Sequence, residues 1–288
     1  MIKVKTFGWK NKILDQISRI NEGLINNNCI LTDEYPDIVY SNNDMYDDIL
    51  EFSEKQDKKP FIILNVLDLQ IGNPSYNIKK VRDQLIKANA ITCISKTVQK
   101  QIKDELSLES HVIYNPIKDV QFDQSITKKN LFLYVGRAND KRKRFILIKD
   151  FIKNTELEDS LIVCGSEYPD CGKYAGIIND NDLNYLYNAS KFVLLPSSFE
   201  GLGLPMIEAM VAGTIPITCE DNLTANEFCP KEFISKPDPI SILNKAKELN
   251  RNYNYYRSIA LEAGIYYKKL MNKNQIAKNI IDLYQKTS

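Results

Sequence analysis

A glycine-containing loop that leads into a helix is the part of this sequence whose chemistry is clearest. The apolar run Phe192–Leu195 is typical of a buried parallel strand, and residues 205–212 have the composition of a helix. The loop between them therefore ends at a helix N-terminus, where free N–H groups and partial positive charge favour an anion. Gly201 and Gly203 have no side chains to keep a ligand away from the backbone.

The helix after this loop has typical first and last residues. Pro205 suits the first helical position, because its missing N–H would have no partner there, and Gly213 suits the C-terminal stop. The N–H groups from Gly203 to Met206, including that of Leu204, are then expected to face the anion.

Two carboxylates flank this anion site. Glu200 lies in the loop and Glu208 lies one turn into the helix. Carboxylates accept hydrogen bonds from hydroxyl groups, so a helix start flanked by acids suits a ligand that is part phosphate and part polyol, such as a nucleotide sugar. Taken singly, each residue has a simpler interpretation, as a solvated glutamate or as a surface glutamate near the favourable end of the helix dipole.

The order of residues over 196–216 is more specific than either acid. It reads Pro-Ser-x-x-Glu-Gly-x-Gly-Leu-Pro-x-x-Glu-Ala-Met-x-x-Gly-x-x-Pro. This closely resembles the signature of retaining glycosyltransferases of family 4, the group 1 glycosyltransferases, with Leu202 where that family usually has Phe. The resemblance implies the GT-B fold, in which two Rossmann-like doubly wound α/β domains face each other across a cleft, here with a shortened N-terminal domain.

Length and composition set further limits. The 288 residues allow two domains, 43% hydrophobic residues support a core in each, and a net charge of +1 gives no overall attraction to nucleic acid. Without an apolar stretch of membrane-spanning length, we expect a cytoplasmic protein, at most peripheral to the inner face of a membrane. The basic helix expected at 77–88 is the best candidate for such contact, although a solvated helix face explains it better.

Strand and helix patterns alternate along the chain, which predicts βαβ units and parallel sheets. The predicted strands of the first half are Lys3–Phe7, Cys29–Thr32, Asp37–Ser41, Phe61–Val66, Ala90–Ser95 and His111–Asn115, and its helices are 12–26, 44–56, 77–88 and 96–107. The polar segment 117–129 marks a domain boundary. With the resemblance, this gives an acceptor-side domain over 1–118, a nucleotide-sugar domain over 119–270, and a helix over 271–288 that in GT-B proteins crosses back to the first domain.

Candidate residues in the first half are few. Gly8 and Trp9 follow the first strand, where the family commonly has a longer glycine-rich loop, and Trp9 suits either sugar stacking or core packing. Asp68 stands where the family often has a His-Asp pair facing the sugar. His111, the single histidine, is better explained as an edge-strand residue than as a catalytic base.

The second half begins with the strand Leu131–Val135 and a basic loop. Gly136-Arg137 and the later Lys-Arg-Phe resemble the family's segment whose cations hold the donor diphosphate. The resemblance assigns this role to Arg137 and Lys143, with Lys141 as the alternative lysine. The basic run 141–144 also fits a solvated helix start or a nucleic-acid patch.

The next segments complete the candidate donor site. Gly165 follows a strand at Ser160–Cys164, and Ile177 belongs to a segment, 174–178, that resembles the family's brief strand beside the base. Helices are also expected at 145–153, 239–249 and 253–270, and a strand at Ile215–Cys219.

A metal site is not expected. Asp180-Asn-Asp182 has the Asp-x-Asp spacing of metal-binding glycosyltransferases, but apolar residues follow at helical spacing, so Asp180 is better interpreted as an N-cap. The cysteines form no Cys-x-x-Cys pair and are expected to be buried free thiols. They are Cys29, Cys93, Cys164, Cys171, Cys219 and Cys229.

The resemblance implies a retaining hexosyl- or glycosyltransferase of EC class 2.4 that needs no cofactor. Its donor would be a UDP- or GDP-sugar and its acceptor a carbohydrate, lipid or protein. Glu208 would hold the ribose, and Glu200 would hold the sugar and place its anomeric carbon. The alternative is a non-catalytic GT-B-like protein that binds a nucleotide or nucleic acid, which the reduced glycine loop and the missing histidine of the first half favour.

Overall fold

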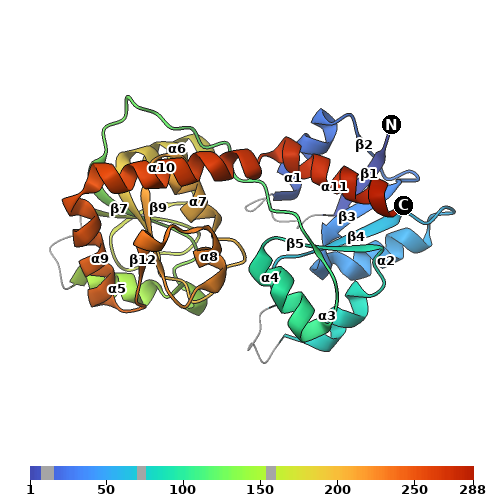
Figure 1. Cartoon of the computed structure of the whole chain (residues 1–288), viewed down its shortest axis with the longest axis horizontal. Coiled ribbons are helices and arrows are strands. Elements are labelled where there is room, and N and C mark those ends of the chain that lie inside the picture. Colours follow the sequence, from blue (N-terminus) through green and yellow to red (C-terminus); the bar gives the residue numbers. More distant parts are fainter. Residues whose placement is uncertain (8–15, 70–75, 154–159) are drawn as a thin grey trace. The chain divides into compact units, whose positions relative to one another are not determined.

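The computed structural model describes residues 1–7, 16–69, 76–153 and 160–288. The chain divides into two compact units, residues 1–116 with 270–288, and residues 117–269. Each unit contains a six-stranded parallel sheet with flanking helices, which confirms the predicted fold class of two doubly wound α/β domains (Figure 1).

The first unit has the sheet order β2-β1-β3-β4-β5-β6. Its elements are β1 (Lys3–Phe7), α1 (Gln16–Asn26), β2 (Ile30–Leu31), β3 (Ile38–Asn42), the 3₁₀ turn η2 (Asn43–Met45), α2 (Tyr46–Glu54), β4 (Phe61–Val66), α3 (Ile78–Leu85), β5 (Ala90–Cys93), α4 (Lys96–Gln101), the π-helical turn η3 (Ile102–Leu106), β6 (His111–Val112) and the C-terminal helix α11 (Lys273–Thr287). The order reverses between β1 and β3.

The core of the first unit joins α11 to elements more than 200 residues earlier in the chain. Ile276 and Ile280 of α11 pack in one apolar cluster with Ile20 and Leu24 of α1 (Figure 1). The helices approach so closely that a Cβ placed on Gly23 would lie 2.2 Å from the Lys273 carbonyl oxygen. Glycine is therefore required where these two helices cross.

The second unit has the order β12-β11-β10-β7-β8-β9. Its elements are β7 (Lys129–Val135), the 3₁₀ turn η4 (Lys141–Lys143), α5 (Phe145–Lys153), β8 (Leu161–Cys164), β9 (Lys173–Gly176), α6 (Asp180–Ala189), β10 (Ser190–Leu195), α7 (Leu204–Val211), β11 (Ile215–Cys219), α8 (Leu223–Phe228), the 3₁₀ turn η6 (Lys231–Phe233), β12 (Ile234–Ser235), α9 (Pro239–Arg251) and α10 (Tyr253–Leu270).

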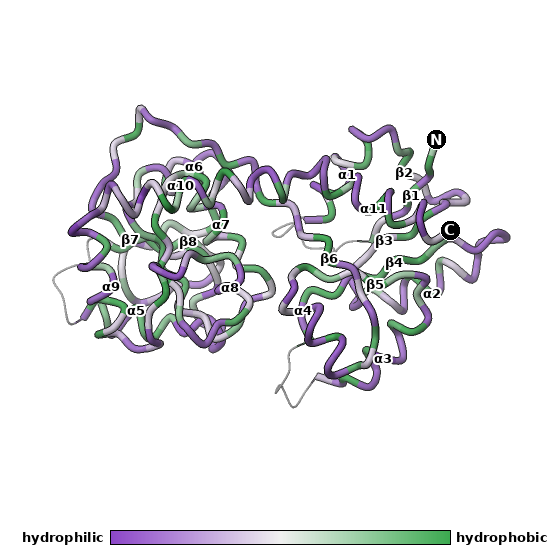
Figure 2. Tube along the Cα trace, in the orientation of Figure 1, coloured by the Kyte–Doolittle hydropathy of each residue, from purple (hydrophilic) through white to green (hydrophobic). Residues whose placement is uncertain are grey.

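Apolar strands form the interior of both sheets, and Figure 2 colours β4 of the first sheet as hydrophobic. In the second unit, Phe132 of β7 stacks on Phe192 of β10 at a centroid distance of 5.4 Å and meets Phe151 of α5 edge to face at 5.2 Å. Aromatic pairs of this kind add to the stabilisation from buried area. They hold β7 and β10, the two central strands, in a fixed pairing.

Several predicted boundaries are wrong, each for a local reason. The strand expected at His111–Asn115 pairs with β5 only through His111 and Val112. The helix expected at 96–107 changes from α4 to the π-helical η3 at Ile102. The strand expected at 174–178 ends at Gly176, whose φ of +71° breaks the extended conformation.

All six cysteines are buried and free, as predicted. No helix within residues 1–7, 16–69, 76–153 and 160–288 is long and apolar enough to cross a membrane.

Candidate functional site

The predicted donor residues of the second unit gather at one point of its sheet. The strand order reverses between β7 and β10, and in sheets of this type ligands bind beyond the carboxyl ends of the strands at such a reversal. Gly136 follows β7, and the loop 196–203 follows β10. The sequence therefore brings its basic loop and its glycine loop to the two sides of the expected ligand position.

An ion pair joins these two loops. Lys143 Nζ lies 2.8 Å from Oε1 and 2.6 Å from Oε2 of Glu200. The Lys143 side chain is 22% exposed and that of Glu200 only 8%. The cation expected to hold a diphosphate and the acid expected to hold a sugar thus neutralise each other in this structure. Lys141, the alternative lysine, is exposed and belongs to the same 3₁₀ turn.

Two further contacts fix the basic loop. The Ser198 N–H donates to the Arg142 carbonyl at 2.8 Å, which ties η4 to the loop after β10. The Arg144 guanidinium contacts both carboxylate oxygens of Asp221, at 3.1 and 2.5 Å, and so ties η4 to the segment after β11. Lys143 is held between these anchored neighbours.

Arg137 lies more openly at the start of the same loop. Its guanidinium is 57% exposed and contacts the Asp140 carboxylate at 2.8 Å. Asp140 also accepts hydrogen bonds from the backbone and side chain of Arg142. Burial works to raise the pKa of Asp140, but the hydrogen bonds and charge of Arg142, with the charge of Arg137, hold it below its ordinary value. Arg137 is therefore positioned by an ionised carboxylate and still accessible.

The helix after the glycine loop begins one residue earlier than predicted. Gly203 is the N-cap with a φ of +74°, so Leu204 is the first helical residue and Pro205 the second. Pro205 still fits, because the first-turn N–H groups have no helical partners. The Met206 N–H already donates to the Gly203 carbonyl at 2.9 Å. At the other end, Gly213 has a φ of +65° and stops the helix as predicted.

Glu208 is buried in α7, with 3% of its surface exposed. Its Oε1 accepts the backbone N–H of Lys118 at 3.2 Å, and its Oε2 accepts the phenol of Tyr187 at 3.0 Å. Burial, and then the charge of Glu208, raise the pKa of Tyr187 well above its ordinary value, so this phenol keeps its proton and donates it. Each oxygen of the carboxylate thereby accepts a hydrogen bond that orients it.

The other predicted donor-side residues follow neighbouring strands. Gly165 comes directly after β8, and a Cβ on it would lie 2.0 Å from the Gly136 carbonyl oxygen, so only glycine allows these strand ends to approach. Tyr174 of β9 donates to the Gly165 carbonyl at 2.9 Å. Ile177 follows β9 and is 61% exposed. Gly201 lies half-buried beside Glu200.

Two of the residues singled out in the first unit, Asp68 and His111, lie within the described residues. Gly8 and Trp9 lie outside the described residues. Asp68 comes two residues after β4, where its carbonyl accepts the Tyr76 phenol at 3.2 Å. Burial, followed by the charge of Asp68, raises the pKa of Tyr76 to about 12. His111 lies exposed in the edge strand β6.

Asp180 is not the N-cap of α6. The cap is Asn179, whose side-chain oxygen accepts the Asp182 N–H at 2.9 Å, while the Asp180 carboxylate pairs with Lys118 at 2.5 Å. Both Asn and Asp are favoured N-caps, so the sequence left a one-residue ambiguity. Within residues 1–7, 16–69, 76–153 and 160–288, no group of three His, Cys, Asp or Glu side chains is arranged to hold a metal ion.

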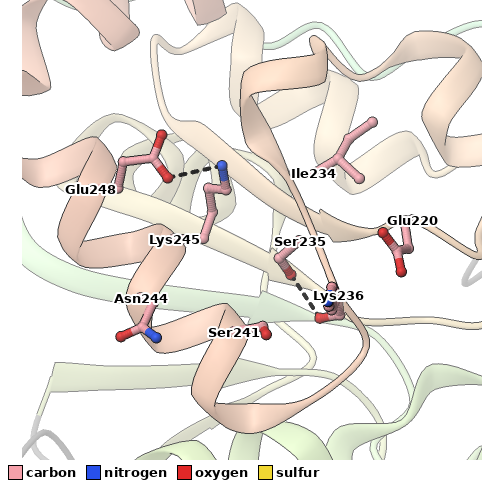
Figure 3. Close-up of a pocket in the computed structure, with 8 residues that line it drawn as sticks. All are labelled: Glu220, Ile234, Ser235, Lys236, Ser241, Asn244, Lys245 and Glu248. Atoms are coloured by element: carbon pink, nitrogen blue, oxygen red, sulfur yellow. Dashed lines mark hydrogen bonds and ion pairs between the residues drawn. The ribbon is translucent and has the colours of Figure 1, made fainter.

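A separate open hollow of about 320 Å³ lies beyond the ends of β11 and β12, beside the start of α9 (Figure 3). Its walls carry both signs of charge, and Lys245 there pairs with Glu248 at 3.0 Å. It is lined by Glu220, Ile234, Ser235, Lys236, Ser241, Asn244, Lys245 and Glu248.

Four contributors to the site were missed in the sequence. Tyr187 lies at the spacing of an apolar helix face, so its hydroxyl gave no signal, and the Lys118 N–H is a backbone group. Arg144 and Asp221 are 77 residues apart and could be paired only in three dimensions. The sequence held one signal for Arg144: it precedes the apolar Phe145, which indicates that this arginine lies close to the core.

A family model for group 1 glycosyl transferases matches residues 116–263, just over half of the chain. The O-antigen chain mannosyltransferase RfbU of Salmonella typhimurium is 31% identical over 152 residues, which cover 46% of this chain and 42% of that protein. The O-antigen chain mannosyltransferase B of Escherichia coli is 27% identical over 114 residues, 39% of this chain and 30% of that protein. The chain thus matches less than half the length of either relative.

Solved structures match over nearly the whole chain. A sucrose-phosphate synthase from Thermosynechococcus elongatus has a TM-score of 0.80 at 13% identity, covering 99% of both chains. Anabaena Alr3699/HepE, solved with UDP and glucose, has a TM-score of 0.76 at 12% identity, covering 99% of this chain and 100% of that one. At these identities the similarity shows only a shared fold. That fold is the two-domain α/β fold of GT-B glycosyltransferases.

Proposed function

The chain belongs to the group 1 glycosyltransferase family, and we propose that it transfers a sugar from a nucleoside diphosphate sugar to an acceptor. The single observation that carries this proposal is the pairing of Lys143 with Glu200 at the strand-order reversal of the second sheet. A cation and an acid side by side suit the phosphate and the hydroxyls of one ligand. The second unit, residues 117–269, is then the donor domain.

The proposed roles follow from the charges of the reaction. Breaking the bond between sugar and phosphate builds negative charge on the diphosphate and positive charge on the sugar ring. Lys143, the exposed Arg137 and the N–H groups at Gly203–Leu204 would stabilise the first, and the Glu200 carboxylate the second. Glu208, oriented by two donors, would accept the ribose hydroxyls.

We further propose retention of configuration without a metal ion. Two cationic side chains supply the charge that a divalent ion would otherwise bring to the diphosphate. Glu200, released when Lys143 turns to the diphosphate, would position the sugar, and the acceptor would attack from the face that the diphosphate leaves. The acceptor's proton passes to the departing phosphate oxygen, which balances the step.

The relatives' names refer to mannose transfer, and one structural neighbour was solved with UDP and glucose. UDP- and GDP-hexoses are therefore the first donors to test, with a carbohydrate, lipid or protein as acceptor. In the basic run 141–144, three residues are ion-paired, with Asp140, Glu200 and Asp221, which disfavours the nucleic-acid alternative.

The test is calorimetric titration of the protein with UDP, GDP and ADP in EDTA, followed by their hexose conjugates. One diphosphate should bind, and Arg137→Ala and Glu208→Ala should each weaken it about tenfold or more. Arg251→Ala, at the exposed end of α9, is the matched control and should bind as the unmodified chain does. If no nucleotide binds, the proposed donor site is wrong. Binding that requires a divalent ion would overturn metal independence alone.

A further inference from the structure

Three loops of the second unit are joined to one another by contacts that form a closed ring. The loops follow β7, β10 and β11, which are adjacent strands of the second sheet. The Arg142 carbonyl accepts both the N–H and the hydroxyl of Ser198, at 2.8 and 3.2 Å. These two hydrogen bonds join the loop after β7 to the loop after β10.

The loop after β11 closes the ring through two consecutive residues. The Asp221 carboxylate contacts the Arg144 guanidinium at 3.1 and 2.5 Å. The side-chain amide of the fully buried Asn222 donates to the Ser197 carbonyl at 3.0 Å. Each of the three loops therefore contacts both of the others.

The two members of the central ion pair, Lys143 and Glu200, are part of this ring. Lys143 lies between Arg142 and Arg144, the residues through which its loop is held, and Glu200 lies two residues after Ser198. A shift of either loop would change the short distances between the Lys143 ammonium and the Glu200 carboxylate. The ring therefore fixes where the ammonium lies relative to the acid.

The backbone conformation of Arg144 indicates what its side chain does. Arg144 follows the 3₁₀ turn η4 with a φ of +48° and a ψ of +40°, the left-handed region that L-residues with bulky side chains rarely adopt. Glycine would form this turn without strain. The arginine instead supplies a planar guanidinium, which matches the two oxygens of the Asp221 carboxylate.

We infer that Arg144 and Asp221 are positioning residues, which hold Lys143 where a diphosphate can bind it. This inference rests on the proposed function, because it takes Lys143 to be a ligand of the diphosphate. It also predicts the sign of an effect. By charge alone, removal of the Asp221 carboxylate would strengthen the binding of an anion nearby, whereas loss of a positioning residue weakens it.

Calorimetric titration with the nucleoside diphosphate that binds best tests this prediction. Asp221→Asn and Arg144→Gly should each weaken binding about tenfold, since each removes hydrogen bonds between charged groups. Glycine keeps the turn at position 144, because it adopts a positive φ freely. Arg144→Asp combined with Asp221→Arg restores the ion pair with a residue that tolerates the left-handed region, and it should recover binding to within about threefold.

A double-mutant cycle shows whether Arg144 acts through Lys143. Lys143→Ala by itself should weaken binding about tenfold or more. In the Lys143→Ala background, Arg144→Gly should change affinity less than about twofold, because both substitutions act on the same ammonium group. Additive losses would overturn the inference, since they would mean that Arg144 acts on the ligand or the fold independently of Lys143.

Glu248→Gln is the matched control. It also removes an acid that is paired with a cation of the same unit, since Glu248 contacts Lys245 at 3.0 Å in α9. Its binding should stay within about twofold of the unmodified chain. Thermal unfolding identifies any variant that fails to fold, and the remaining variants of the Arg144–Asp221 pair then decide the result.

The outcomes distinguish a failure of this inference from a failure of the proposed function. If the unmodified chain binds no nucleoside diphosphate, or if folded Lys143→Ala binds it equally well, the proposed role of Lys143 is wrong. If Lys143→Ala weakens binding while folded Asp221→Asn leaves it unchanged or strengthens it, the positioning role of the pair is wrong and the proposed function stands.

Discussion

Glu200→Gln should bind nucleoside diphosphate more tightly while it turns over more slowly. In the structure both carboxylate oxygens of Glu200 accept hydrogen bonds from the Lys143 ammonium, at 2.8 and 2.6 Å. A diphosphate must therefore compete with Glu200 for that cation. Glutamine keeps the shape of the side chain and one neutral acceptor but removes the charge. The diphosphate can then bind Lys143 with a smaller loss of interaction free energy between Lys143 and residue 200.

The magnitude follows from the burial of the pair. With 22% and 8% of the two side chains exposed, this ion pair is shielded from solvent, unlike most surface pairs. Hydrogen bonds to charged groups contribute about 1.5–3 kcal/mol, and glutamine retains part of that through its remaining acceptor. A net gain of about 1–2 kcal/mol corresponds to roughly 5- to 30-fold tighter binding. Turnover should fall roughly 100-fold, because the carboxylate that faces the sugar is lost.

Calorimetry with the diphosphate and a turnover assay with its hexose conjugate measure the two effects separately. Asp140→Asn is the matched control, since it also removes an acid paired with loop cations. Those cations, Arg137 and Arg142, are 57% and 45% exposed, so their release should change affinity less than about threefold. Unchanged or weaker diphosphate binding by folded Glu200→Gln would refute the competition argument.

Three further predictions concern stability and reactivity. Burial and the charge of Arg257 lower the pKa of Lys128 from 10.5 to about 7, so between pH 7 and 10 the unfolded chain binds a proton that the folded chain does not. The unfolding free energy of the unmodified chain relative to Lys128→Met should therefore rise with pH over that window, by up to about 1 kcal/mol per pH unit in urea titrations, and a flat difference would contradict it. Burial raises the pKa of Cys164 to about 11 and of Cys219 to about 12, so a disulfide reagent at pH 8 should modify both slowly until the protein is denatured. Gly23→Ala should lower the unfolding free energy by about 1–3 kcal/mol in urea, because the added methyl meets the Lys273 carbonyl, and an unchanged midpoint would show that the helices separate freely.

The sequence specified the sheets well because their strands are apolar runs of fixed length. The strands Lys3–Phe7, Phe61–Val66 and Ile215–Cys219 and the helix Phe145–Lys153 have the predicted bounds. Errors occur where two residues can play one role, as with Asn179 and Asp180 at the start of α6, or where pairing stops at a sheet edge, as in β6. Such choices depend on tertiary contacts that local patterns do not contain.

In the candidate site, the backbone geometry was predictable from the sequence, whereas the partners of the side chains were not. A strand, a glycine loop and a helix start lie within 26 residues of sequence, so their combined geometry follows from local rules. The partners of the site residues come from elsewhere: Lys143 lies 57 residues from Glu200, and Lys118 lies 90 residues from Glu208. Periodicity placed Tyr187 in the core and could not show which atom its hydroxyl would meet.

The two glutamates differ in a way that bears on their proposed roles. Glu200 is satisfied by a flexible lysine, whose ammonium can move to a diphosphate when one enters. Glu208 accepts the backbone N–H of Lys118 and the phenol of the fully buried Tyr187, and neither donor is a side-chain cation that could move to the ligand. A fixed acceptor suits a part of the ligand that stays unchanged through the reaction, such as a ribose. An exchangeable pair suits the groups whose charge changes, because separating Lys143 from Glu200 gives the leaving diphosphate a cation and the sugar an anion in the same movement.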